Sequence, residues 1–257
     1  NKKDIKEIIF NAKNKETYEE RLDFLKNRFG GQTCYILACG PSMRDIDKEK
    51  LIDEVRNNCL FTIKQSFFSF RDHVDFHFFN TNNFINYPDS RDIFYVGSSD
   101  WGTEESVRTI YWKEQQVDIC TRVHGKDPLG VQQHHDGFKG LTPYTFENSG
   151  LLRHWGAGIM FENVLYFALH LGFQNIRTVG WDYVNVSAGE KNHIHFYDEA
   201  SRFKLVNPAA KPYDTEFSDS IEMSRLFHEY FSKMGINIRC HQSDKCFLPE
   251  EIERYKL

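Results

Sequence analysis

Short apolar runs that alternate with amphipathic helical stretches dominate the pattern of this chain. The clearest run, Tyr35 to Cys39, is long enough for a buried strand but too short for a helix, and Gly40-Pro41-Ser42 ends it. Asp45 or Asp47 then caps a helix that continues to about Val55. A strand, a tight turn and a helix form the first half of a βαβ unit. We therefore expect a ligand site at the carboxyl end of this strand.

The same alternation continues along the chain and predicts its fold class. Further strand-like runs cover 59–63, 75–79, 93–96, 107–112, 117–123, 175–180 and 236–240, and helical patterns cover 1–28, 156–171, 219–234 and 248–255. This order predicts an α/β fold with a Rossmann-like, mainly parallel sheet flanked by helices. We expect residues 1–30 to be an N-terminal helical appendage and 31–257 to be the main domain. Within it, 100–150 is a lid, an insertion or an ordinary surface loop.

Composition narrows the class of protein. The chain has 257 residues, 40% of them apolar, with 23 Phe and 12 Tyr, which is ample for one core. The net charge of −5 is made of interspersed signs, so no basic face argues for nucleic acid. The six cysteines form no CxxC pair, which favours reduced thiols in a cytoplasmic protein. No apolar run reaches membrane-spanning length. The chain begins with Asn rather than Met, so we treat it as an excerpt of something longer, and contact with a membrane surface is left open.

Polar side chains follow the first three predicted strands, where an α/β sheet binds its ligand. The backbone at Gly40 to Ser42 can approach a ligand closely and offers N–H groups for phosphate. Lys64-Gln65 ends the second strand and Asn80 the third. The alternative for the first turn is an ordinary strand-to-helix connection.

A second small-residue turn opens the helix at 156–171. Gly156-Ala157-Gly158 at a helix N-terminus is a further candidate anion site, and close helix packing is the alternative. The strand that follows ends in Trp181-Asp182-Tyr183.

Histidines gather in two polar stretches. His193 and His195 lie close to Tyr197, Asp198 and Glu199, and a histidine in such a loop suits general acid or base work; a metal site and a plain surface loop are the alternatives. The stretch 124–140 also carries histidines, for which a metal site, a lid and an ordinary loop all remain open.

Taken together, the motifs resemble the bacterial sialyltransferases that use CMP-sialic acid, and a wider set of polysaccharide-locus proteins, some of which are described as similar to a pterin diphosphokinase. The resemblance covers residues 33–240 and rests on ILACGPSMRDID, FTIKQSFF, FHFFNTNN and GAGIMFENVLYFALHLGFQNIRTVGWDY. In addition, HFYDEA is similar to the short histidine motif of animal sialyltransferases. The resemblance implies a variant GT-A fold with a nucleotide-sugar-binding catalytic domain over 31–257.

The resemblance also implies roles for the nucleotide-binding residues. Gly40, Pro41 and Ser42 would lie against the nucleotide, while Lys64, Gln65 and Asn80 would face cytidine phosphate and sugar. Gly156, Ala157 and Gly158 would hold the nucleotide from the other side, and Asp182 would orient the ribose or the histidine. The chain departs from the family pattern, with Lys64 in place of a usual asparagine and Ala157 in place of a serine or threonine.

The implied reaction is inverting, metal-independent transfer of a sialic-acid-like or Kdo-like sugar from its CMP ester to a glycan or glycolipid hydroxyl. His195 would be the base, with His193 in reserve, although the catalytic histidine of the bacterial enzymes comes later in the chain. Tyr183, Tyr197 or Lys64 would stabilise the departing phosphate. No DxD motif stands at the expected strand end, so we expect neither metal nor cofactor.

Other readings stay open alongside this one. A Mg²⁺-dependent diphosphokinase is one alternative, and a non-catalytic nucleotide-sugar-binding domain of a larger polysaccharide-synthesis protein is another. We expect a cytoplasmic protein without a transmembrane segment. Location at the inner face of the membrane and assembly into a homo-oligomer are left open.

Overall fold

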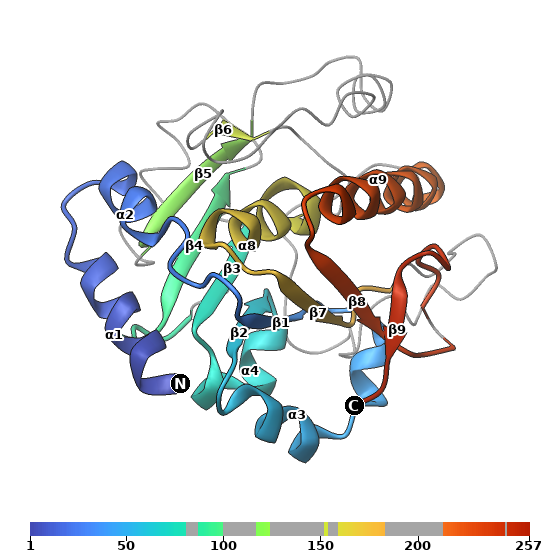
Figure 1. Ribbon diagram of the computed structural model, residues 1–257, viewed down its shortest axis with the longest axis horizontal. Coiled ribbons are helices and arrows are strands. Elements are labelled where there is room, and N and C mark those ends of the chain that lie inside the picture. Colours follow the sequence, from blue (N-terminus) through green and yellow to red (C-terminus); the bar gives the residue numbers. More distant parts are fainter. Residues whose placement is uncertain (81–86, 100–116, 124–151, 154–158, 183–212, 245) are drawn as a thin grey trace.

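The structure is a computed structural model that describes the chain except for residues 81–86, 100–116, 124–151, 154–158, 183–212 and 245 (Figure 1). Within the described residues, its central feature is a nine-stranded sheet in the order β6-β5-β4-β3-β2-β1-β7-β8-β9, in which every neighbouring pair is parallel. The strands are β1 (Thr33–Leu37), β2 (Cys59–Ile63), β3 (Phe76–Asn80), β4 (Phe94–Ser99), β5 (Ile119–Val123), β6 (Leu152–Arg153), β7 (Asn175–Val179), β8 (Asn237–His241) and β9 (Glu253–Tyr255). The α/β class and the parallel sheet predicted from the sequence are confirmed.

The strand order identifies one special place in the sheet. From β1 to β6 each new strand adds on one side, and the chain then returns to the other side of β1 to lay down β7, β8 and β9. The order therefore reverses between β1 and β7, which pair directly from Thr33 with Asn175 to Leu37 with Val179. In open α/β sheets, ligands bind outside the carboxyl ends of the strands at such a switch point.

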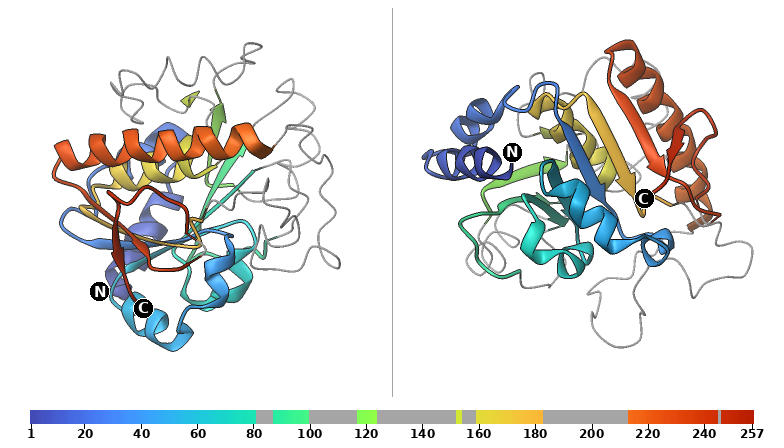
Figure 2. Two further views of the ribbon diagram at one scale, coloured as in Figure 1. Left: turned by 90° about the vertical axis from the view of Figure 1, so that its right-hand side faces the viewer. Right: turned by 60° about the horizontal axis from the view of Figure 1, so that its bottom comes forward.

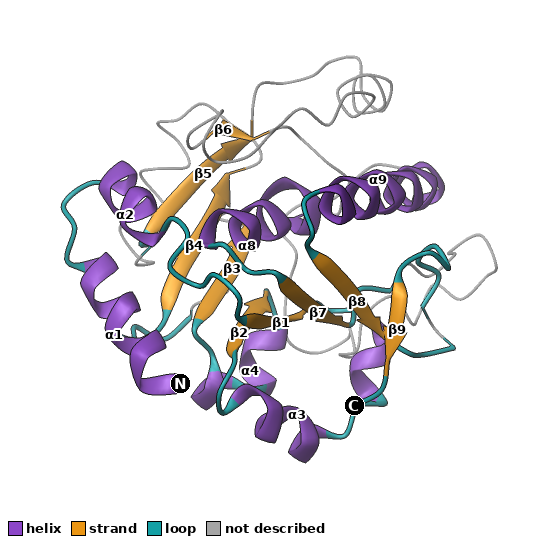
Figure 3. Ribbon diagram, in the orientation of Figure 1, coloured by secondary structure: helices purple, strands orange, loops and turns teal. Residues whose placement is uncertain are grey.

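Helices cover both faces of the sheet (Figures 2 and 3). One face carries α1 (Lys2–Lys13), α2 (Tyr18–Leu25), the π-helical turn η3 (Met160–Val164) with α8 (Leu165–Leu171), and α9 (Tyr213–Lys233). The other face carries the 3-10 turn η1 (Pro41–Arg44), α3 (Lys48–Val55), α4 (Ser66–Ser69) and the 3-10 turn η2 (Arg71–His73). Asp47 caps α3 by accepting the N–H groups of Glu49 and Lys50, one of the two caps that the sequence predicts.

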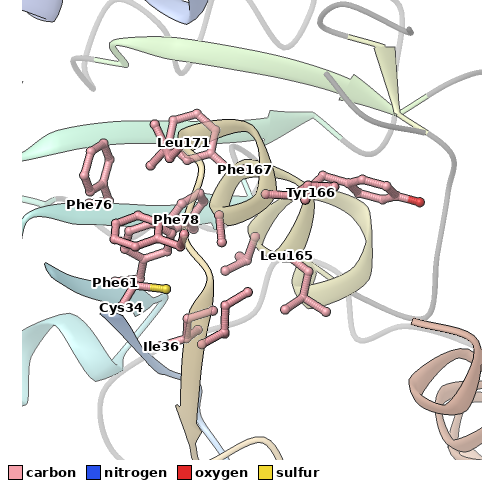
Figure 4. Close-up of a cluster of buried hydrophobic side chains, with 14 of the residues drawn as sticks. Cys34, Ile36, Phe61, Phe76, Phe78, Leu165, Tyr166, Phe167 and Leu171 are labelled. Atoms are coloured by element: carbon pink, nitrogen blue, oxygen red, sulfur yellow. The ribbon is translucent and has the colours of Figure 1, made fainter. Parts of the chain in front are cut away.

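Aromatic side chains fill the core between the sheet and α8. Phe167 packs between Phe61, Phe76 and Phe78, with ring centroids 5.4 to 6.4 Å away (Figure 4). Tyr166 points away from the sheet toward α9, where its ring lies 5.2 Å from that of Phe227. Successive side chains along a strand point to opposite faces of the sheet, so each face packs against its own layer of helices, as is typical of a buried parallel sheet.

The N-terminal helices pack into the same core and close the amino edge of the sheet. Ile5 and Ile9 are buried against it, and lysines of α1 reach buried carboxylates. Lys6 Nζ lies 2.9 Å from Asp75, whose other oxygen accepts the Leu60 N–H, and Lys13 Nζ lies 3.0 Å from Asp118. The helical segment predicted before residue 30 is confirmed, with a break at 14–17 where Thr17 caps α2.

The C-terminal segment differs from the prediction. The sequence pattern predicts a helix over 248–255, but residues 253–255 form strand β9 beside β8. Arg254 explains the difference, because its guanidinium donates to the carbonyls of Leu248 and Ile252 and so ties the segment into a turn before the strand. A strand edge that is free to pair overrides weak helix propensity in so short a segment.

Candidate functional site

The loops after β1 and β7 meet at the switch point and are bound to each other. The Ser42 N–H donates to Asp182 Oδ2 at 2.7 Å, and the Ser42 hydroxyl donates to Asp182 Oδ1 at 2.8 Å. The Gly180 N–H donates in turn to Ser42 Oγ at 3.2 Å, and the Gly40 N–H donates to the Gly180 carbonyl at 2.7 Å. We call these four residues, Gly40, Ser42, Gly180 and Asp182, the clasp.

The clasp explains why residue 40 is glycine. A Cβ at this position would lie 2.5 Å from the Gly180 carbonyl oxygen and 2.6 Å from Asp182 Oδ2. Gly180 is equally constrained, because its φ of +70° favours glycine and a Cβ there would lie 2.5 Å from Met43 Cγ. The sequence suggested that a ligand closely approaches the backbone at Gly40. In the structure, the loop after β7 makes this close approach instead.

The clasp also decides where a phosphate can bind. The Ser42 N–H, one of the donors predicted to hold phosphate, is already occupied by the carboxylate of Asp182. A second anion at this donor would meet a negative charge at hydrogen-bond distance. A phosphate at this edge of the sheet therefore needs a positively charged side chain that lies away from Asp182.

Lys64 supplies such a cation at the end of β2. It is half-buried and holds the left-handed conformation with φ of +50°, which is uncommon for a residue with a side chain. Its N–H donates to the Phe78 carbonyl at 2.9 Å, which fixes the turn. Within the part of the chain that the structure describes, its ammonium has no hydrogen bond or ion pair. Its charge acts on the buried thiol of Cys39, opposing the rise in the pKa of that thiol caused by burial.

Gln65 and Ser66 face inward from the same turn. Gln65 is buried, and its Oε1 lies 3.7 Å from Cys39 Sγ, at the end of β1. The Ser66 hydroxyl donates to the Leu37 carbonyl at 2.7 Å and accepts the Ile63 N–H at 2.9 Å, so it joins the ends of β1 and β2. These contacts fix the turn, whose one charged side chain is the half-buried Lys64.

The remaining predicted site residues divide into two groups. The backbone of Asn80 ends β3, level with Ser98 of β4, at the carboxyl edge where it was expected. The residues outside the described part of the chain are Gly156, Ala157, Gly158, Tyr183, His193, His195 and Tyr197. The histidine-rich stretch 124–140 and the predicted strand 107–112 also lie outside it. Their roles stay predictions.

Asn163 is a candidate that the sequence pattern did not single out. It lies in the π-helical turn η3, is fully buried, and neither its amide nitrogen nor its amide oxygen finds a hydrogen-bond partner in the described structure. An unpaired buried amide destabilises a fold, and π turns occur often at functional sites. The signal in the sequence was a polar pair, Glu162-Asn163, inside an apolar helix.

An open pocket of about 590 Å³ lies past the ends of β8 and β9, which follow β7 on the side of the sheet away from β1. Its lining comprises Asp45, His241, Gln242, Ser243, Asp244, Lys256 and Leu257. His241 is buried, and its Nδ1 has no partner among the described residues; burial lowers its pKa, and the charge of Asp45 opposes this. No motif predicted this pocket, although the three polar residues that follow β8 were a signal for it.

Two kinds of feature are absent from the described residues. They contain no group of three or more His, Cys, Asp or Glu side chains arranged to hold a metal ion. Nor does any helix among them combine the length and apolar character needed to cross a membrane.

Comparison with known proteins adds no family to these observations. Neither a scan of protein-family models nor a search of curated proteins finds a match to this chain. The resemblance to sialyltransferases therefore remains a prediction from the motifs.

Proposed function

We propose that this protein is an inverting, metal-independent glycosyltransferase that transfers a sialic-acid-like or Kdo-like sugar from its CMP ester to a glycan or glycolipid hydroxyl. The observation that carries the proposal is the switch point of a doubly wound parallel sheet, with the clasp on one side and, at the next strand end, a Lys64 ammonium that is unpaired among the described residues. Sheets of this kind bind nucleotides at this place. The order of motifs in the sequence supports CMP as the nucleotide.

The charges of the described residues suggest how the donor would lie. Its phosphate would be bound by Lys64, because the carboxylate of Asp182 excludes an anion from the Ser42 N–H. Asp182 is held in place by Ser42, and because a carboxylate oxygen accepts more than one hydrogen bond, it could also accept from ribose hydroxyls or from a base. Asn80, at the end of β3, would contact the sugar or the phosphate from the neighbouring strand.

The reaction needs little covalent chemistry from the protein, because CMP is already a good leaving group. A base must take the proton of the acceptor hydroxyl as the new glycosidic bond forms. A positively charged or hydrogen-bond-donating side chain must stabilise the phosphate as its bond to the sugar breaks. In this proposal His195 is the base, and Lys64, with Tyr183 or Tyr197, stabilises the phosphate.

Thermal-shift measurements test the choice of nucleotide. We expect CMP and CDP to raise the melting temperature in the presence of EDTA, and ATP or GTP with Mg²⁺ to have no comparable effect. The variant Lys64→Met should bind CMP about ten times more weakly, because it loses a phosphate contact worth about 1.4 kcal/mol. Lys48→Met removes an exposed lysine at the start of α3 and is the matched control.

Three outcomes would contradict the proposal. Stabilisation by ATP only with Mg²⁺ would favour a diphosphokinase, and no response to any nucleotide would favour a non-catalytic role. Equal CMP affinity in Lys64→Met and wild type would remove Lys64 from the site.

A further inference from the structure

Two cysteines lie side by side at the carboxyl end of β8. Cys240 is buried in the strand and pairs across the sheet with Thr178, while Cys246 is half-buried on the loop that follows. Cys246 packs against the cluster of buried side chains that contains Cys240, and each thiol shifts the pKa of the other. Both are free thiols, so the structure holds the pair in its reduced form.

A fixed positive charge lies against this pair. Arg254 Nη1 donates to Cys240 Sγ at 2.7 Å, and its guanidinium is held by the carbonyls of Ile252 and Leu248. Interaction between the two thiols raises the pKa of Cys240 and lowers that of Cys246, while burial raises both and the Arg254 charge lowers both. The guanidinium beside Cys240 therefore favours one thiolate in the pair, and Cys246 carries the sulfur that is more exposed to a reactant.

A second pair of cysteines provides an internal contrast. Cys34 and Cys59 are direct neighbours on β1 and β2, but both are fully buried. Burial raises the pKa of each thiol well above its usual value. The two cysteines are close together in both pairs. Cys240 and Cys246 differ from the other pair in two ways: the Cys246 side chain is partly exposed, and a guanidinium donates to Cys240.

We propose that Cys240 and Cys246 are a redox site, which a hydroperoxide converts to a reversible disulfide. The Cys246 thiolate attacks one peroxide oxygen, the O–O bond breaks, and Cys246 becomes a sulfenic acid while the other oxygen leaves as hydroxide and takes up a proton. The Cys240 sulfur then attacks the Cys246 sulfur, its proton goes to the departing hydroxyl, and water leaves. Overall, two thiols and one hydrogen peroxide give one disulfide and two waters.

The position of the pair connects this chemistry to the switch point. Cys246 Sγ lies 4.0 Å from the Trp181 carbonyl oxygen, and the charge of Asp182 raises the pKa of the Cys246 thiol in opposition to Arg254. Oxidation would remove the thiolate from beside the clasp and fix the loop after β8. The redox chemistry of the pair does not depend on the nature of the ligand bound at the switch point.

The test is peroxide oxidation of the purified, fully reduced chain under native conditions, followed by alkylation of the remaining thiols and peptide mapping. We expect a cross-linked peptide that joins Cys240 to Cys246, reversed by dithiothreitol, while Cys34 and Cys59 are recovered as thiols. Cys240→Ser should stop at the sulfenic acid on Cys246, trapped by dimedone, and Cys246→Ser should give no cross-link. Cys120→Ser, a buried cysteine of β5, should behave as wild type.

Circular dichroism establishes first that each variant is folded. Should a variant not fold, the wild-type chain alone decides the matter through the order in which its six cysteines are alkylated by limiting iodoacetamide. Cys246 should react before the five buried thiols. The proposal is overturned if Cys34 and Cys59 oxidise as fast as the β8 pair, if Cys246 is not alkylated first, or if peroxide yields no Cys240–Cys246 link.

Discussion

At the scale of single residues, the clasp between Ser42 and Asp182 fixes the geometry of the switch point. A charged carboxylate accepts both the N–H and the hydroxyl of one serine, which is among the stronger arrangements that hydrogen bonds offer. It holds the turn after β1 against the end of β7 without any ligand. In the proposed function, polar groups at the neighbouring strand ends, Lys64 above all, bind the ligand.

Gly40→Ala tests the clasp. The added Cβ would fall 2.5 Å from the Gly180 carbonyl oxygen. Because this neighbour is a backbone atom, the clash can be relieved only by a shift of the main chain, which costs free energy. We expect the free energy of unfolding in urea to drop by about 1–3 kcal/mol. Gly30→Ala is the control, because the nearest atom to its Cβ would be 3.9 Å away, and it should change stability by less than about 0.5 kcal/mol. Equal stabilities of the two variants would mean that the loops do not pack as described.

At the scale of elements, β2 and β3 are joined on one face by a buried histidine. His77 Nδ1 lies 2.9 Å from Thr62 Oγ1, and the ring packs among Phe67, Phe79 and Tyr87. Burial lowers the pKa of His77 from 6.5 to about 3. The folded protein therefore holds this imidazole neutral in a range where the unfolded chain binds a proton.

The sign of the resulting pH dependence follows from linkage. Between pH 6.5 and about 3 the unfolded state binds more protons at this group, so stability falls as the pH falls, by up to about 1.4 kcal/mol per pH unit. His77→Phe, which suits the aromatic surroundings, should remove this part of the dependence in urea titrations from pH 7 to pH 4.5. His73→Gln, at a half-exposed histidine, should retain it. A wild-type slope unchanged in His77→Phe would show that His77 does not control it.

Local pattern predicted those elements whose own residues decide their structure. Strands β2 and β7 and the cap Asp47 follow from short apolar runs and from a side chain that accepts its own helix's N–H groups. Strand β9 could not be predicted in this way, because it depends on an edge of β8 and on Arg254. The π turn around Asn163 could not be predicted either, because a change in main-chain hydrogen bonding over one turn hardly alters the spacing of apolar residues in the sequence.

At the scale of the whole molecule, the candidate site is the product of strand order. The sequence predicted that polar residues would follow the strands, and the parallel sheet brings the ends of β1, β2 and β3 to one edge. It could not reveal that Asp182, far along the chain, occupies the Ser42 N–H, because this contact spans 140 residues. That one contact moves the expected phosphate from the glycine turn to Lys64.

A crystal grown with CMP tests the account most directly, through the difference map at the carboxyl edge of the sheet. We predict nucleotide density beside the clasp, with the phosphate within hydrogen-bond distance of Lys64 Nζ and the ribose or base toward Asp182. Phosphate density on the Ser42 N–H in place of the Asp182 carboxylate would contradict the assignment of charges. CMP bound only elsewhere, or absent from crystals soaked at a saturating concentration, would contradict the proposed site.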